Sequence, residues 1–192
     1  IQTALPTDGQ WEEAELQVLL AEFKAGLERY LVNHEAPIQS LAELIEFNQR
    51  NADRELAFFG QELLEQAQAS PGLSDPAYIE ARMRARRLAG PQGIDAALQA
   101  DRLDALIVPT TGPAWVTDPV NGDNFPGGGY SAAAVAGYPS ITVPMGSANG
   151  LPLGLLFMGK AWSEPRLLNL AYAYEQRTRA RVPPALDSAP LP

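Results

Sequence analysis

Apolar residues recur at three- and four-residue intervals through the first part of the chain, which predicts that it is largely helical up to Asp101. The longest such stretch follows Asp8 and the acidic pair Glu12-Glu13. Because acidic residues in a first turn interact favourably with the helix dipole, we expect a long amphipathic helix here. Its apolar face would consist of Leu16, Leu19, Leu20, Phe23, Leu27, Tyr30 and Leu31.

Two further helix starts carry recognisable caps. Ser40 is followed three residues later by Glu43, which is the arrangement of a capping box. Asp75-Pro76 places a hydrogen-bond acceptor at the cap and a proline in the first turn. The apolar face of the helix that begins there would carry Ile79, Met83 and Leu88, and shorter helices are predicted over residues 61–69 and 94–101.

The later part of the chain shows short, continuous apolar runs bounded by Pro and Gly. Residues 105–108 do not alternate between apolar and polar, so we expect a buried central strand. Residues 141–143 and 153–157, separated by the turn residues 146–150, predict a β-hairpin. A helix from residue 163 to about residue 181 would cover one face of that hairpin.

Between the first predicted strand and the hairpin, the chain becomes strongly polar. Residues 110–130 form a loop rich in Gly, Pro, Asn and Asp. A loop of about twenty residues is uncommon in a compact domain and is usually a binding or lid element when it is ordered. Three aromatic residues favour an ordered loop over a disordered connection: Trp115, Phe125 and Tyr130.

Composition narrows the classes of function. The 192 residues contain 14 Lys and Arg against 23 Asp and Glu, for a net charge of −9, which argues against nucleic acid or a membrane as the main partner. Cysteine is absent and His34 is the one histidine, so Cys-based or His-rich metal sites and a Ser-His-Asp triad are not expected. No apolar run approaches the ~18 residues of a membrane span. We therefore expect a soluble protein, cytoplasmic by default, with an extracytoplasmic location left open.

The motifs of common nucleophiles are missing from the sequence. There is no Gly-x-Ser-x-Gly elbow and no Ser-x-x-Lys, and the glycine run 127–129 lacks the context of a phosphate-binding loop. Lys24 is interpreted as a snorkelling or surface residue rather than a base, and His34 as a capping or surface residue rather than a catalyst. Acid–base work by Asp118 and Asp123 stays a minor alternative. The residues alone indicate a binding loop without a nucleophile.

Four successive motifs closely resemble the C-terminal part of amidase-signature hydrolases: residues 103–110, 136–146, 150–159 and 164–176. Upstream residues resemble the peptide amidase branch in particular: Phe23-Lys24, Phe47-Asn48, Phe59-Gly60-Gln61-Glu62 and Gly93-Ile94-Asp95. The resemblance implies an α/β fold in which helices wrap a mixed, twisted sheet. It also implies hydrolysis of carboxamides to acid and ammonia without a metal or organic cofactor.

The catalytic part of that family has no counterpart in the chain. Such enzymes use a Ser–cis-Ser–Lys triad and backbone N–H groups of a Gly/Ser-rich signature, all in the N-terminal portion. None of the eight serines, nor Lys24 or Lys160, has a matching context. We therefore expect residues 1–192 to be a single segment, the C-terminal portion of an amidase domain, with no catalytic residue of its own and no activity in isolation. The alternative is a binding module that retains the scaffold and does no chemistry.

The resemblance also suggests where a substrate would be held. The C-terminal loop of such enzymes faces the triad, and a peptide amide presents N–H donors, so an acceptor beside aromatic walls is needed. The candidates are Asp123, Asn124, Trp115, Phe125 and Tyr130. Asp123 capping a local turn is an equally weighted interpretation. Expected partners are a small amide or peptide amide, and a second copy or the N-terminal half bound to the strands at 105–108 and 141–143.

Overall fold

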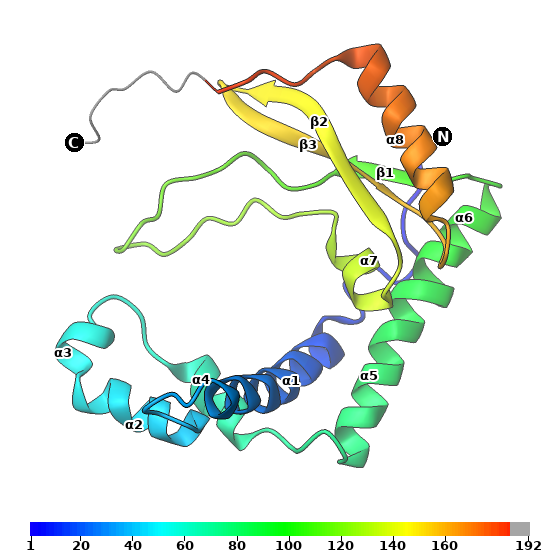
Figure 1. Ribbon diagram of the computed structural model, residues 1–192. Coiled ribbons are helices and arrows are strands. Elements are labelled where there is room, and N and C mark those ends of the chain that lie inside the picture. Colours follow the sequence, from blue (N-terminus) through cyan, green and yellow to red (C-terminus); the bar gives the residue numbers. More distant parts are fainter. Residues whose placement is uncertain (185–192) are drawn as a thin grey trace. The chain divides into compact units, whose positions relative to one another are not determined.

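The structure, a computed structural model, describes residues 1–184 and divides into two compact units (Figure 1). One unit is formed by Ala4–Gly93 and the other by the chain from Ile94 onward together with Ile1–Thr3. The first unit is helical, and the sheet lies in the second. Among the described residues, no helix combines the length and apolar character needed to cross a membrane.

The helices of the first unit confirm the pattern of the sequence. The predicted long helix, the capped helix after Ser40, the segment near residue 61 and the Asp75-Pro76 helix are all present, and a one-turn helix after residue 51 was not predicted. The elements are α1 (Glu12–Asn33), α2 (Leu41–Arg50), α3 (Ala52–Glu55), α4 (Glu62–Ala69) and α5 (Pro76–Ala89).

Both predicted caps are formed. The Ser40 hydroxyl accepts a hydrogen bond from the Glu43 backbone N–H at 3.2 Å, and the Glu43 carboxylate accepts one from the Gln39 N–H at 2.8 Å. The Asp75 carboxylate accepts one from the Ala77 N–H at 2.8 Å. These bonds satisfy N–H groups that have no partner within a first helical turn, which is why such residues mark helix starts.

The predicted buried face of α1 is wrong, although the helix itself is confirmed. Its buried residues include Ala14 and Ala21, and it packs against α4 and α5. An alanine face lets neighbouring helices approach closely, and the larger apolar side chains then point away from them. Four members of the predicted face are 44% to 58% exposed: Leu16, Leu19, Phe23 and Tyr30.

Helix α5 also buries small residues instead of its predicted apolar face. Ile79 and Met83, two of the three residues predicted to mark its buried face, are exposed. The buried residues are Tyr78 and the small residues Ala81, Ala85 and Ala89. A hydrogen bond from the Tyr78 hydroxyl to the Glu22 carboxylate of α1, at 2.6 Å, adds to this packing. Exposed apolar surface of this extent on two helices is typical of an interaction surface.

The chain passes from the first unit to the second in a segment that stays helical through a Gly-Pro-Gln-Gly sequence. Glycine and proline commonly interrupt a helix, but here they adopt a π-helix, in which each turn takes up an extra residue. A short helix before the hairpin, over 131–136, was not predicted. The elements are η1 (Gly90–Asp95), α6 (Ala96–Ala100), β1 (Leu106–Pro109), α7 (Ser131–Ala136), β2 (Ser140–Ala148), β3 (Leu151–Met158) and α8 (Glu164–Thr178).

The hairpin of β2 and β3 is confirmed, and its strands are longer than predicted. The expected five-residue turn is reduced to Asn149 and Gly150, whose φ angles of 51° and 81° suit a two-residue hairpin turn. Gly146, with φ 141°, lies at a β-bulge inside β2 instead of in the turn.

Strand β1 was predicted to be central and lies at an edge. The order in the described sheet is β1-β3-β2, so β3 is the central strand, and both pairs are antiparallel. Leu106 pairs with Met158 and is buried, whereas Ile107 is 62% exposed. The α/β class is confirmed, and the parallel pairing expected of a mixed sheet does not occur among these strands.

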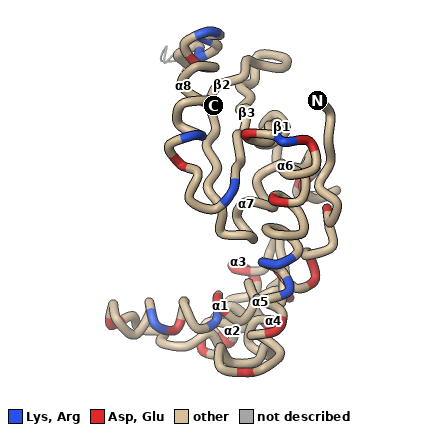
Figure 2. Tube along the Cα trace, turned by 90° about the vertical axis from the view of Figure 1, so that its right-hand side faces the viewer, with Lys and Arg blue, Asp and Glu red and all other residues tan. Residues whose placement is uncertain are grey.

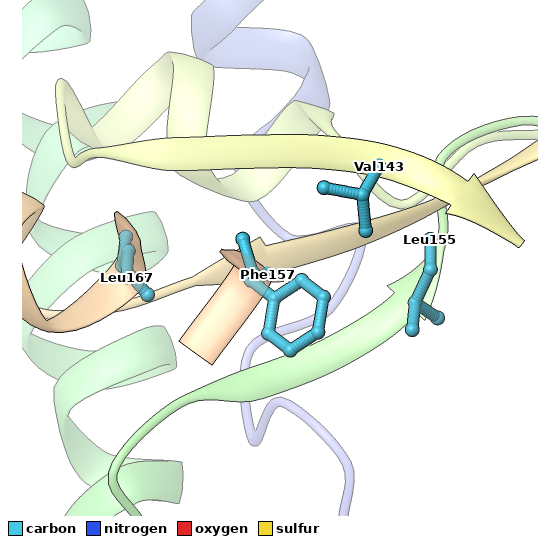
Figure 3. Close-up of a cluster of buried hydrophobic side chains, with 5 residues drawn as sticks. Val143, Leu155, Phe157 and Leu167 are labelled. Carbon is cyan, nitrogen blue, oxygen red and sulfur yellow. The ribbon is translucent and has the colours of Figure 1, made fainter. Parts of the chain in front are cut away.

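The core of the second unit lies between the hairpin and α8, as predicted (Figure 3). Val143, Leu155 and Phe157 of β2 and β3 form one buried cluster with Leu167 and Ala171 of α8. The ring of Phe157 also meets that of Tyr174, edge to face, with centroids 5.8 Å apart. Lys, Arg, Asp and Glu positions are scattered along the helices and loops of both units (Figure 2).

Candidate functional site

The predicted loop over residues 110–130 is closed at its neck by backbone hydrogen bonds. The Thr110 N–H donates to the carbonyl of Gly154 in β3 at 2.8 Å. The Gly129 N–H donates to the Thr110 carbonyl at 3.0 Å, and the Gly112 N–H to the Gly127 carbonyl at 3.2 Å. The two ends of the loop are therefore tied to each other and to the sheet.

The glycine run explains why the neck can be this narrow. A Cβ on Gly128 would lie 2.6 Å from Cε1 of Tyr130 and 2.9 Å from the Thr110 carbonyl oxygen, and one on Gly129 would overlap the Val108 side chain. Real Cβ atoms do not approach other atoms so closely, so glycine is required for the close approach of the two arms. The run serves this packing and not phosphate binding.

A turn at the tip of the loop is capped by Asp118. One carboxylate oxygen of Asp118 accepts hydrogen bonds from the Val120 and Asn121 N–H groups, both at 2.9 Å, and the other accepts one from the Asn121 side chain at 2.7 Å. The bonds from Asn121 and Val120 stabilise the charged form and lower the pKa of Asp118. Asp118 is therefore poorly suited to act as a general acid.

Asp123 takes no part in the hydrogen bonds that close this turn, within the residues described. Its side chain and that of Asn124 are exposed. Asp123 was a candidate for capping this turn. The residue that caps it is Asp118, five residues earlier. The Asp123 carboxylate is thus available to an outside donor, and its role toward a substrate stays a prediction.

The structure brings together two of the three candidate aromatic residues. Trp115 and Phe125, from opposite arms of the loop, meet edge to face with ring centroids 5.6 Å apart. Asp123 and Asn124 lie directly before Phe125 in the chain. Tyr130 lies at the neck, with its ring against Gly128. The ring pair holds the two arms together while both rings stay accessible to solvent.

Two threonines beside the neck were missed by sequence reasoning. The hydroxyl oxygens of Thr110 and Thr142 lie 2.6 Å apart, and either can donate the hydrogen bond. Gly154, between them on β3, has no room for a Cβ because that atom would lie 2.8 Å from the Thr110 hydroxyl. Thr110 and Thr142 are 32 residues apart in sequence, so no local pattern could have indicated the pair.

A second polar pair that was missed lies where α7 leads into β2. The Tyr138 hydroxyl donates to the Asp95 carboxylate at 2.8 Å. Burial, together with this carboxylate, raises the pKa of Tyr138 to about 12. The other oxygen of Asp95, Oδ1, is buried and has no partner within residues 1–184. The pair ties the start of the hairpin to the junction of η1 and α6.

We expect Tyr138→Phe to lower the free energy of unfolding by about 1–3 kcal/mol, because the variant leaves both oxygens of a half-buried carboxylate without a donor. In the wild type the raised pKa favours the folded state fully below pH 10, and this contribution is lost as the pH rises through about 12. Urea denaturation at several pH values measures both effects. A variant with wild-type stability at pH 7 would contradict this role for the pair.

Lys24 and His34 have structural partners. The Lys24 ammonium donates to the Gln68 carbonyl at 2.9 Å, which links α1 to α4. His34 Nδ1 lies 2.8 Å from the Tyr30 carbonyl at the end of α1, and this bond confirms the predicted helix cap. Lys24 is half-buried and anchored, which agrees with the expected structural role and not with that of a base.

The fold and the site together define the class of protein: an α/β chain with an ordered loop at the edge of an antiparallel hairpin. The profile of the Amidase family matches residues 4–168, and the chain belongs to that family. This finding confirms the resemblance seen in the sequence.

Solved structures agree with this assignment. The chain is 66% identical to the native peptide amidase from Stenotrophomonas maltophilia, with a TM-score of 0.86, over 96% of this chain and 37% of that one. It is also 66% identical to a peptide amidase in complex with the competitive inhibitor chymostatin, with a TM-score of 0.90, over 96% of this chain and 38% of that one.

A plant relative gives the same picture. A probable amidase of Arabidopsis thaliana is 32% identical over 179 residues, which is 92% of this chain and 31% of the relative. The chain thus spans about a third of the length of these relatives. Its similarity to the peptide amidases runs through both the helical unit and the sheet unit.

Proposed function

We propose that this chain supplies the scaffold and the substrate-binding loop of an amidase that hydrolyses carboxamides, with peptide C-terminal amides as the substrate class. One observation carries the proposal: the Asp123 carboxylate is exposed and uninvolved in its own turn, beside an aromatic pair on an anchored loop. The 66% identity to the peptide amidase from Stenotrophomonas maltophilia supports the choice of substrate.

Each loop residue has a role in this proposal. A peptide amide carries backbone N–H donors, and an ionised carboxylate accepts such bonds more strongly than a neutral group does. Asp123 accepts from a substrate N–H or ammonium group, and Asn124 offers both a donor and an acceptor. Trp115 and Phe125 provide a flat apolar wall for the substrate side chain, and Tyr130 holds the neck.

The nucleophile and the oxyanion-stabilising N–H groups come from polypeptide outside these 192 residues. In this proposal, no serine or lysine of this chain carries out a catalytic step. The partner that completes the site is the remaining part of an amidase chain, and the exposed apolar faces of α1 and α5 are surfaces that such a partner would cover.

The test is a chimaera in which this chain replaces the part of the Stenotrophomonas maltophilia peptide amidase that it matches. We expect Asp123→Ala to lower kcat/KM for peptide amides by about 5- to 150-fold, equivalent to about 1–3 kcal/mol of transition-state binding. The rate of ammonia release at steady state measures kcat/KM for each variant.

Asp53→Ala, which removes an exposed carboxylate from α3, is the matched control and should leave kcat/KM unchanged. Unchanged kcat/KM in the Asp123 variant, for both neutral and amine-bearing amides, would remove Asp123 from the site. A folded chimaera that binds amides and releases no ammonia would instead favour the non-catalytic binding module.

A further inference from the structure

The dipeptide Asn-Gly occurs twice in the chain, at Asn121-Gly122 and at Asn149-Gly150. It is a labile context for the asparagine amide, because glycine has no side chain to shield its backbone nitrogen from the asparagine Cγ. Both asparagines are exposed, and both glycines have a φ of 81°. Exposure and glycine conformation therefore do not distinguish the two sites, and the difference between them lies in their hydrogen bonds.

The reaction open to such an asparagine is loss of its side-chain amide. The backbone nitrogen of the following glycine gives up its proton and attacks Cγ of the asparagine. The bond from Cγ to Nδ2 breaks, and the leaving nitrogen takes up the proton and departs as ammonia. Water then opens the resulting succinimide ring at one of its two carbonyls, which yields aspartate or isoaspartate. Because the nitrogen must reach Cγ, groups that hold either atom in place slow the reaction.

Both reacting groups are held at Asn121-Gly122. The Gly122 N–H donates to the Asp118 carbonyl at 2.9 Å. The Asn121 side-chain nitrogen donates to one Asp118 carboxylate oxygen at 2.7 Å, and the Asn121 backbone N–H donates to the other at 2.9 Å. The attacking nitrogen and the amide that has to leave are thus both fixed on Asp118. These bonds have to break before attack, and bonds to a charged carboxylate are the stronger kind.

The corresponding groups are free at Asn149-Gly150. These two residues form the turn that joins β2 to β3 (Figure 1), and their φ angles of 51° and 81° are typical of a type I′ turn. The hydrogen bond of such a turn joins the flanking residues, here the paired Ala148 and Leu151. Within residues 1–184, neither the Gly150 N–H nor the Asn149 side chain has a hydrogen-bond partner.

We propose that Asn149 is a deamidation site of the folded protein, and that hydrogen bonds to Asp118 protect Asn121 from the same reaction. This modification does not depend on the proposed function. It needs water as its co-reactant and no catalytic group. Ammonia leaves once from each modified asparagine, so the signal in an ammonia assay is stoichiometric and does not depend on any serine of the chain.

The two products affect the hairpin differently. Asp-Gly suits a type I′ turn as well as Asn-Gly does, so aspartate at position 149 leaves the turn intact. In isoaspartate the backbone runs through the side-chain carbons, which lengthens the turn. The turn fixes the register of Ala148 with Leu151, so isoaspartate disturbs the pairing of β2 with β3 at that end.

Peptide mapping by mass spectrometry, after incubation of the 192-residue chain at mildly alkaline pH, tests the proposed site. We expect Asn149 to be converted at least about tenfold faster than Asn121, since the rate depends on reaching the reacting geometry. The chain in denaturant is the matched control, because the hydrogen bonds are lost there and the two sites should react at similar rates. Equal rates in the folded chain, or faster conversion of Asn121, would overturn the proposal.

Asp118→Ala tests the source of the protection. The variant removes the carboxylate that holds Asn121 and leaves the hairpin unchanged. Conversion of Asn121 should become several-fold faster, while Asn149 keeps its wild-type rate. Asp123→Ala is the matched control, since Asp123 takes no part in the bonds that close this turn, and it should change neither rate. An unchanged rate at Asn121 in the Asp118 variant would refute protection by Asp118.

Asn149→Asp separates the new charge from the lengthened backbone. In urea denaturation, this variant should unfold at the wild-type midpoint, and chain enriched in isoaspartate at residue 149 should unfold at a lower urea concentration. A wild-type midpoint for the isoaspartate form would contradict the predicted disturbance of the hairpin register.

Discussion

The 192-residue chain by itself should release no ammonia from peptide amides above background. The proposed nucleophile and oxyanion donors lie outside it, and removing one oxyanion donor alone typically costs about 2.7–4 kcal/mol of transition-state stabilisation. Losing the positioned nucleophile also removes the effect of proximity, which lowers the activation barrier by a further ~7–11 kcal/mol. Binding of an amide at the proposed loop site would not by itself lower the barrier, because no reacting group is present.

A coupled ammonia assay on the purified chain measures this, with the chimaera as the positive control. Background turnover should persist unchanged after each serine is replaced by alanine. Turnover by the chain that one serine substitution abolishes would identify a nucleophile within these residues and would overturn the assignment of catalysis to the remaining polypeptide.

Phe157→Ala should lower the free energy of unfolding of the sheet unit by about 3–5 kcal/mol. Phe157 is 7% exposed, lies on the central strand β3 and touches both the α8 helix and the ring of Tyr174. Alanine would leave a cavity between the hairpin and α8 that the paired strands cannot close. Guanidinium denaturation followed by circular dichroism measures the change.

Leu168→Ala is the matched control for this substitution. Leu168 lies on the outer side of α8 and is exposed, so its removal should change the free energy of unfolding by less than about 0.5 kcal/mol. A loss below about 1 kcal/mol for Phe157→Ala would mean that the hairpin and α8 do not share one cooperative core.

Local chemistry made much of the fold predictable. The caps at Ser40 and Asp75 act within three residues, and the turn residues before Leu151 indicated the hairpin, although its turn has two residues and not five. Such signals operate over a few bonds, so the sequence carries them whatever surrounds them. The same holds for the loop over 110–130, whose composition ruled out regular structure.

The buried face of a helix and the position of a strand in the sheet depend on tertiary packing, and the spacing of apolar residues could not predict them. The apolar stripe of α1 has helical spacing, and the structure buries its alanine face instead, because the face that fits the neighbours depends on the shapes of α4 and α5. In the same way, the run at 106–108 has the composition of a central strand and lies at an edge, because strand order depends on which partners are present.

The candidate site shows the same division. The sequence by itself determined that a polar loop with aromatic anchors precedes the hairpin, since both features are local. The turn cap is also local, because Asp118 bonds residues two and three positions away, but sequence reasoning weighed Asp123 for it. Only the tertiary structure joined Thr110 to Thr142 and Tyr138 to Asp95. A hydrogen bond between side chains 32 or 43 residues apart exists only once the sheet and the helices have brought them together, and no local pattern encodes that distance.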